Sequence, residues 1–167
     1  GFGFFDDGPY KNAFAFDGAL PQLPHTKGTV LYGDILFGHL MRTDPTGTAV
    51  MWVMAHEFAH VWLFQRGDIA KLGPDASPLT GKRIELHADY LAGFYVGQRK
   101  RDNPSITLMK TGAEIWKLGD TNFNHPDHHG TPAERLAAAE AGFHVAFTDH
   151  RDAAHAYKAG LDYVLRL

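Results

Sequence analysis

The sequence predicts an α+β fold that is mostly helical, with a small β-sheet near its N-terminus. Three observations lead to this prediction. The chain has 167 residues, a length that suits one domain, 1–167, with a single sizeable core. Hydrophobic residues make up 44% of the chain and charged residues 21%, which is the balance of a globular protein. Strand-like patterns occur only near the N-terminus, and helical spacing dominates the remainder.

The N-terminal segment supplies the predicted sheet. Residues 1–10 are rich in glycine and aromatic residues, and we expect an irregular surface arm there. The segment Asn12–Phe16 alternates phenylalanine with small residues, which predicts a short strand, and Thr29–Tyr32 predicts a second one. Apolar residues within 35–41 then have helical spacing, and this helix is expected to end at Asp44-Pro45.

A helix over 48–65 is the central element of the prediction. Apolar residues surround it on all sides, so we expect it to be buried, and Gly67 is its expected end. A loop should follow over 67–81, because Pro74 and Pro78 interrupt that segment. Further helices are expected from there to about residue 101, over 104–118, from Thr131, and from Thr148 or Asp149.

The charge balance and the absence of cysteine exclude several classes of protein. The formal net charge is −3, so we expect no nucleic-acid partner. Without cysteine the chain has no disulfide, no thiol nucleophile and no cysteine-ligated zinc. Its longest apolar stretch, 49–64, is interrupted by polar residues and is shorter than the ~20 residues of a membrane span. The chain has 11 histidines, which directs attention to metal binding and acid–base chemistry.

The central helix carries the segment His56-Glu57-Phe58-Ala59-His60. Residues four apart share one face of a helix, so both imidazoles can bind one metal ion. Glu57 lies about 100° further round the helix, where its carboxylate can take a proton from a metal-bound water. The alternative is that these side chains are ordinary core residues, which would cost roughly 1–3 kcal/mol for each unpaired polar group. A shared metal removes that cost.

A catalytic zinc site has three protein ligands and one open position. The next long helix offers Glu85 and Asp89, one turn apart on one face. Glu85 can bind the metal, while Asp89 can accept the free N–H of a metal-bound histidine and so fix its tautomer. His87 is the weaker candidate, because it lies about 200° round the helix from Glu85. The alternative for both acids is a solvated helix face.

These motifs together resemble the gluzincins. The closer resemblance is to the bacterial neutral zinc metallopeptidases and to the peptidases of the HtpX and CAAX-prenyl-protease type. The zinc-binding part of the resemblance rests on His56–His60 and on Glu85-Leu86-His87-Ala88-Asp89. It extends to an edge-strand segment, a strand–helix unit and two downstream segments, which are Asn12-Ala13-Phe14-Ala15, 29–41, Leu118-Gly119-Asp120 and 129–135.

The resemblance implies a role for each matching residue. His56, His60 and Glu85 would bind one zinc ion, Glu57 would be the general base, and Asp89 would orient a zinc-bound histidine. Either His129 or Arg135 would stabilise the oxyanion. The alternatives are that His129 is a loop residue beside a helix start and that Arg135 forms an ordinary helix salt bridge. A peptide or protein substrate would add itself as an extended strand along Asn12, Ala13, Phe14 and Ala15. His125 and His128 are expected to be loop residues and not a second metal site.

The expected function is therefore that of a zinc-dependent endopeptidase. One alternative is a catalytically inactive metal-binding or regulatory domain, and the intact Glu57 argues against it. Another is a metallo-amidase acting on a small amide or on peptidoglycan, which a closed, small pocket would favour. The chain opens on Gly1 without a signal-like segment. We expect a bacterial cell-envelope or secreted location if a signal or anchor is removed, and a cytoplasmic location otherwise.

Overall fold

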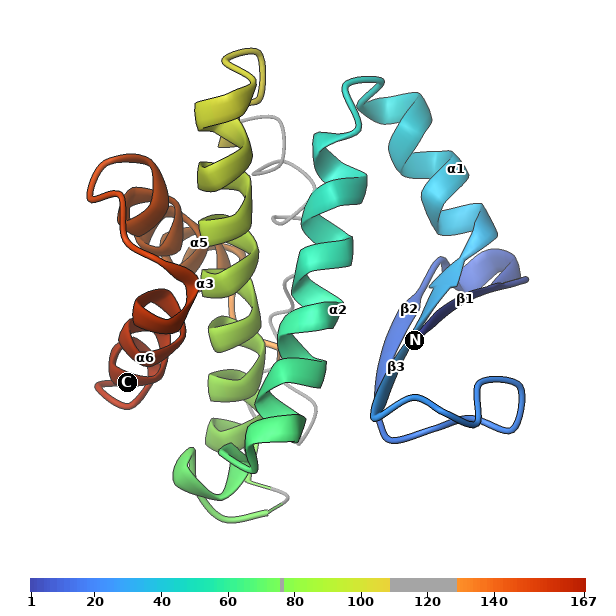
Figure 1. Cartoon of the computed structure of the whole chain (residues 1–167), viewed down its shortest axis with the longest axis horizontal. Helices are drawn as coiled ribbons and strands as arrows, with labels where there is room; N and C mark the ends of the chain where they lie inside the picture. The colour runs from blue at the N-terminus through green and yellow to red at the C-terminus, as the bar shows by residue number, and fades with distance from the viewer. Residues whose placement is uncertain (76, 109–128) are drawn as a thin grey trace.

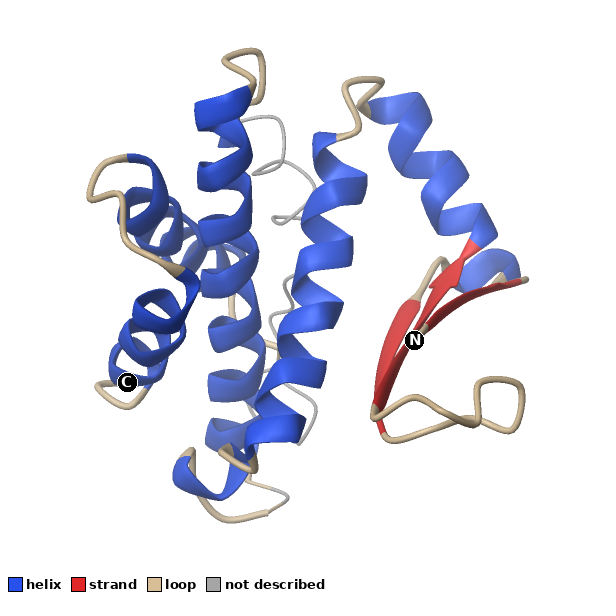
Figure 2. Ribbon diagram, viewed as in Figure 1, coloured by secondary structure: helices blue, strands red, loops and turns tan. Residues whose placement is uncertain are grey.

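The computed structural model describes residues 1–75, 77–108 and 129–167. The fold is α+β and mostly helical, as predicted, with a three-stranded sheet formed by the N-terminal segment (Figures 1 and 2). Helix α2, Thr48–Arg66, lies between this sheet on one side and helix α3, Pro78–Asp102, on the other (Figure 1). Two neighbouring layers explain why α2 is apolar on all sides.

The sheet has the strand order β1-β3-β2, with β1 at Phe2–Phe5, β2 at Ala13–Asp17 and β3 at Gly28–Gly33. Strand β2 runs antiparallel to β3 and β1 runs parallel to it. The prediction of an irregular arm over 1–10 is therefore wrong for β1. The glycine-rich segment pairs with the edge of β3 that β2 leaves free. The Gly1 ammonium group also donates a hydrogen bond to the Gly28 carbonyl at 2.7 Å.

Helix α1, Asp34–Thr43, connects the sheet to α2, and its start is fixed by a buried carboxylate. Asp7 accepts hydrogen bonds from the backbone N–H groups of Ile35, Leu36 and Asn12, at 2.8, 3.1 and 2.9 Å. It thereby ties the first turn of α1 to the residue that precedes β2. At the other end of α2, Gly67 adopts a left-handed conformation with φ 64°, which ends the helix where the sequence predicts.

Three further helices form the remaining described part of the protein. The predicted loop over 67–81 contains a 3₁₀ turn at Ile69–Lys71, and α3 begins earlier than expected, at Pro78. Helix α5, Pro132–Phe147, opens with the predicted capping box at Thr131. Helix α6 spans Ala153–Val164 and begins after Asp152, not at 148 or 149, because the Asp152 side chain caps it. Of the predicted helix over 104–118, residues 109–118 lie outside the described residues. The predicted start at Pro104 is wrong, because 104–107 form a turn and an irregular segment.

Helix α5 packs closely on α3, and glycines at the contact make this possible. A Cβ atom at Gly93 would collide with the backbone of Ala139, and one at Gly142 would collide with the backbone of Tyr90. This close approach brings the buried first turns of α5 next to the middle of α3. Among the helices in the described part of the chain, none is long and apolar enough to cross a membrane.

Candidate metal centre

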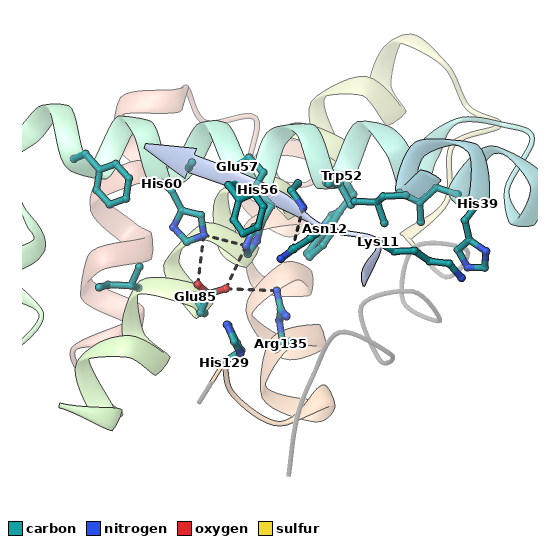
Figure 3. A pocket seen from close by; sticks show the side chains of 18 residues that line it. Lys11, Asn12, His39, Trp52, His56, Glu57, His60, Glu85, His129 and Arg135 are labelled. Carbon is teal, nitrogen blue, oxygen red and sulfur yellow. Dashed lines mark hydrogen bonds and ion pairs between the residues drawn. The ribbon is translucent and has the colours of Figure 1, made fainter. Parts of the chain in front are cut away.

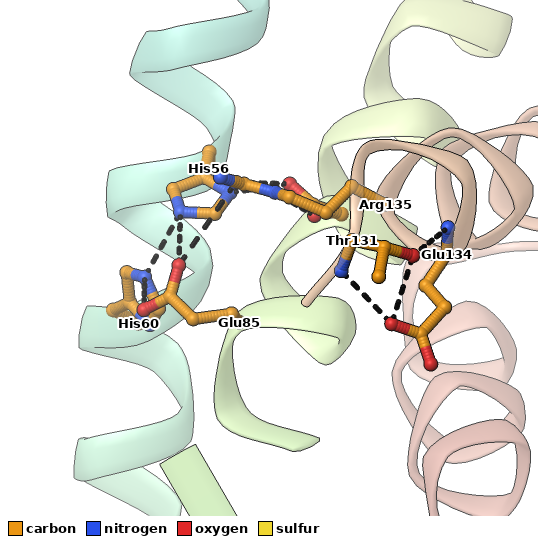
Figure 4. A network of polar contacts seen from close by, with 7 residues as sticks. His56, His60, Glu85, Thr131, Glu134 and Arg135 are labelled. Atoms are coloured by element: carbon orange, nitrogen blue, oxygen red, sulfur yellow. Dashed lines mark hydrogen bonds and ion pairs between the residues drawn. The ribbon is translucent and has the colours of Figure 1, made fainter. Parts of the chain in front are cut away.

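Helices α2 and α3 together bring three potential metal ligands to one point. His56 and His60 lie on the face of α2 that α3 and the sheet cover, and both are buried. Glu85, from the first half of α3, reaches across to them (Figure 4). The two Nε2 atoms are 3.1 Å apart, and the Glu85 carboxylate oxygens lie 3.3 Å from His56 Nε2 and 3.5 Å from His60 Nε2.

The chemistry of this donor set fits a zinc ion. One ligand atom from each of His56, His60 and Glu85 can be chosen so that all three lie within 4.8 Å of one another. Two imidazole nitrogens and one carboxylate oxygen are the donors of a catalytic zinc site, and three protein ligands leave a fourth position open. Within the described residues this is the one group with such an arrangement.

Asp89 lies behind the first of these histidines. Its carboxylate is fully buried, and Oδ1 lies 2.9 Å from His56 Nδ1. An imidazole whose Nδ1–H points to a carboxylate presents the lone pair of Nε2 on its other side, which here faces His60 and Glu85. The structure brings Asp89, one helical turn from Glu85, next to His56, and its role in orienting a metal-bound histidine stays a prediction.

Arg135 is the buried partner of Asp89. Its Nε donates to Oδ2 at 2.7 Å and its Nη2 donates to Oδ1 at 2.8 Å, so the pair is bidentate. The same Nη2 lies 3.9 Å from a Glu85 oxygen, and the guanidinium carbon lies 5.8 Å from the centre of the Trp52 ring. Arg135 therefore balances the charge of two carboxylates, and it also lines the cleft in front of the centre.

Burial and charge shift the proton affinities in this centre in opposite directions. Burial lowers the pKa of His60 to about 4. Burial also disfavours the charged form of His56, but hydrogen bonds and charges from Asp89 and Glu85 outweigh it and raise its pKa to about 10. Burial raises the proton affinity of Glu85, yet the two histidines outweigh this and hold its pKa well below the usual range. Without a metal, a proton on His56 thus acts as the counter-charge of the two acids.

A cleft of about 640 Å³ opens in front of the centre. Glu57 lies on its wall beside His56 and His60 (Figure 3), and burial raises the pKa of the Glu57 carboxyl to about 7. His129, an exposed residue just before α5, lines the same cleft. The cleft thus contains the predicted ligands, the predicted base and both candidates for oxyanion stabilisation.

The predicted substrate strand forms one side of this cleft. Residues Asn12, Ala13, Phe14 and Ala15 all line it. The Gly33 N–H donates to the Asn12 carbonyl, and β2 pairs antiparallel with β3 through Phe14 and Leu31. Because hydrogen-bonded and non-hydrogen-bonded pairs alternate, the backbone groups of Ala13 and Ala15 point away from β3, to the free edge of β2. The Asn12 side chain accepts a hydrogen bond from the Ala13 N–H at 2.9 Å.

Several residues that line the cleft are absent from the sequence-based prediction. Trp52 lies four residues before His56, and its ring centre is 5.1 Å from that of His56. The i, i+4 spacing to a proposed ligand was a usable signal for it. Lys11, His39 and Leu40 have no such local signal, because only the packing of α1 and β2 brings them to the cleft.

The remaining histidines have other positions. His87 is fully buried on another face of α3, where its Nε2 lies 3.2 Å from the Tyr157 carbonyl, so it is not brought to the metal centre. His125, His128 and the segment Leu118-Gly119-Asp120 lie outside the described residues.

Comparisons with known proteins do not assign the chain to a family. No protein-family model, curated protein or solved structure matches the chain. The resemblance to gluzincins consequently rests on the short motifs alone, and it stays a prediction.

Proposed function

We propose that the protein is a zinc-dependent endopeptidase. The observation that supports this best is the convergence of His56, His60 and Glu85 at the floor of a cleft that also contains Glu57 and the free edge of β2. Ligands, a base and a strand edge are the three components that peptide hydrolysis by activated water needs.

Zinc held by these ligands would lower the pKa of a bound water towards ~7 and polarise the scissile carbonyl. Glu57 would accept the proton of that water and later pass it to the leaving amine. Its raised pKa suits both steps, because a base that titrates near neutral pH can also act as an acid. Asp89 would hold His56 in the ligating tautomer, and Arg135 would keep Asp89 and Glu85 ionised.

The substrate would lie along β2 as an added strand. The outward-facing backbone groups of Ala15 and the Ala13 carbonyl supply hydrogen bonds that do not depend on the peptide's side chains. His129 and Arg135 lie on the cleft wall and would donate to the developing oxyanion.

Two other functions fit the metal ligands but explain less of the cleft. A metal-binding domain without activity has no use for a half-buried carboxylate such as Glu57 beside the ligands. A metallo-amidase for small substrates would be served by an enclosed pocket, whereas this cleft of about 640 Å³ extends along a strand edge. The edge of β2 therefore favours an extended peptide.

The test combines metal analysis with a peptide digest. Purified protein is dialysed, loaded with zinc and assayed on a mixture of unstructured peptides, with cleavage sites read by mass spectrometry. Glu57→Gln should keep one zinc per chain and lose at least ~100-fold in kcat/KM, because it removes proton transfer and leaves the ligands intact. Glu140→Gln is the matched control, since Glu140 is exposed on α5 and does not line the cleft.

Two outcomes would contradict the proposal. If the zinc-loaded protein cleaves no peptide in the mixture, it is not a general endopeptidase. If Glu57→Gln retains full activity at full zinc occupancy, Glu57 is not the base.

A further inference from the structure

The cleft continues past the metal centre towards α1, and this extension has an apolar floor. Trp52 and Val53 from α2 line it together with Leu36 and Leu40 from α1. All four side chains are buried, with at most 8% exposed, so they form a fixed surface. A peptide side chain that enters here would exchange water for apolar contacts.

The same end of the cleft carries basic side chains. Lys11 and His39 both line it, beyond Trp52 as seen from the metal centre (Figure 3). Among the described lining residues the only carboxylates are Glu57 and Glu85, which belong to the metal centre. Lys11 forms no ion pair with another described residue. Its ammonium group thus lies at the rim of the cleft without an ion-pair partner in the described part of the chain.

The backbone conformation at Lys11 is unusual and is held by hydrogen bonds of the neighbouring residues. The residue adopts a left-handed conformation with φ 48°, which is uncommon outside glycine, directly before β2. The two neighbours of this bend are held as well, because Asp7 accepts the Asn12 N–H and the Asn12 side chain accepts the Ala13 N–H. The Cα atom of Lys11 is therefore held at a defined position at the beginning of the edge strand, and its side chain extends from there.

The direction of β2 decides which part of a substrate meets this end. Ala13 packs near Trp52 and Val53, whereas Asp17 accepts a hydrogen bond from Gln65 at 3.2 Å. Strand β2 thus runs in the same direction as α2. A peptide paired antiparallel to β2, the more stable arrangement, runs the opposite way. Its residues after the scissile bond would then lie towards Trp52 and Lys11.

We propose that Lys11, with His39 at the same rim, binds a carboxylate of the substrate on the carboxyl side of the scissile bond, and that this makes the protein selective for peptides with such a group. This inference rests on the proposed peptidase function. Trp52 is one turn, ~6 Å, from His56, which corresponds to roughly two extended residues. The carboxylate should therefore lie about two to four residues after the cleaved bond. It belongs either to the C-terminus or to an acidic side chain.

Three matched peptide sets separate these sources. The first set has random positions and a free C-terminus, the second has the same positions and an amidated C-terminus, and the third is amidated with one glutamate at varied positions. We expect kcat/KM of the zinc-loaded protein to be about five- to tenfold higher for one carboxylate-bearing set than for the amidated set, as for a charge-assisted contact. Mass spectrometry then gives the spacing between the carboxylate and the cleaved bond.

Substitutions of Lys11 test whether its ammonium group causes the preference for carboxylate-bearing peptides. Lys11→Met should abolish the preference for the carboxylate-bearing set, because it removes the cation from the rim, while Lys11→Arg should retain it. Lys158→Met removes the same charge from an exposed position on α6 and should change nothing. The zinc-loaded Glu57→Gln protein should also bind peptides of the preferred carboxylate-bearing set more tightly than amidated peptides. The ratio of the two Kd values, measured by fluorescence anisotropy, should match the ratio of the kcat/KM values.

The outcomes distinguish this inference from the proposed function. Equal rates on all three sets, a preference unaffected by Lys11→Met, or a preferred acid before the cleaved bond would each overturn the carboxylate site while leaving peptidase activity established. No cleavage of any set would instead overturn the peptidase proposal. The Kd comparison on Glu57→Gln would still decide whether Lys11 binds carboxylates.

Discussion

Two buried polar clusters lie along helix α2, one between α2 and α3 and the other between the end of α2 and α6, and they differ in what completes them. In the metal centre, His56, His60 and Glu85 turn three acceptor atoms towards one another at 3.1–3.5 Å. In the second cluster, which we call the Asp68 cluster, the buried Asp68 carboxylate accepts from the Tyr157 hydroxyl at 2.9 Å and meets Lys71 Nζ at 2.6 Å. Lysine and tyrosine donors complete the Asp68 cluster, whereas the candidate metal centre without an ion depends on a proton held by His56.

Comparing the two clusters shows how a buried polar cluster that stabilises the fold differs from one that is suited to bind a ligand. The Asp68 cluster connects the end of α2 to α6, and Arg66 adds a cation over the Tyr157 ring at 4.6 Å. Each of its charges has an opposite charge or a donor from the protein, which is what a structural cluster requires. In the candidate metal centre, a proton on His56 is the donor that lies among the three converging side chains, and the centre lies on an open cleft. Its composition makes sense when a cation is bound.

The largest effect is expected for Asp89, because it belongs to both kinds of interaction. Asp89→Ala should lower the free energy of unfolding by about 3–5 kcal/mol, since it leaves the Arg135 guanidinium buried without its bidentate partner. Zinc affinity should fall by about 10–100-fold, because His56 loses the group that orients it. Thermal unfolding of the metal-free protein and a competitive zinc titration measure the two effects separately.

Glu85→Ala should show the opposite balance. It removes a ligand, so zinc affinity should drop by at least ~100-fold, more than the loss of an orienting group costs. Arg135 keeps both hydrogen bonds to Asp89, so the metal-free protein should unfold close to the wild-type temperature. If Asp89→Ala empties the site while Glu85→Ala stays loaded, the two roles are reversed.

A smaller, pH-dependent effect is expected in the Asp68 cluster. Hydrogen bonding from Lys71 and Tyr157 lowers the pKa of Asp68 below its usual value. The ionised Asp68 therefore contributes its full stabilisation of the folded state at pH values above about 4, the pKa of an aspartate in the unfolded chain. This stabilisation is lost as the pH falls from there through the lower pKa of the folded state. Asp68→Asn should cost about 1–2 kcal/mol at pH 7, and the difference in Tm from wild type should shrink towards pH 3. Zinc affinity should not change, and a loss of zinc would contradict the separation of the clusters.

The smallest effect is expected at Tyr32 in β3. Its hydroxyl is fully buried and has no hydrogen-bond partner among the described residues, although it lies close enough to feel the charge of Glu57. Removing an unpartnered hydroxyl costs little, so Tyr32→Phe should change the free energy of unfolding by less than about 0.5 kcal/mol. A tenfold fall in kcat at unchanged Tm would show that this hydroxyl contributes to catalysis.

The sequence by itself determined the fold class, the central helix and the candidate ligands, because these depend on local periodicity. The spacing of His56 and His60 places both on one helix face in any packing, and Glu85 and Asp89 likewise share a face. The capping box at Thr131 and the helix end at Gly67 are equally local, and the structure has both where they were predicted.

Only the tertiary structure decided the remaining features, because they depend on pairings between distant segments. Strand β1 forms because β3 has a second edge with which it can pair. The glycine-rich sequence of residues 1–10 does not by itself indicate this pairing. Arg135 meets Asp89 across 46 positions of sequence, through a contact of α5 with α3 that glycines at both surfaces permit. Lys11 and His39 reach the cleft by the same kind of packing, since periodicity specifies which face a residue occupies but not which segment covers that face.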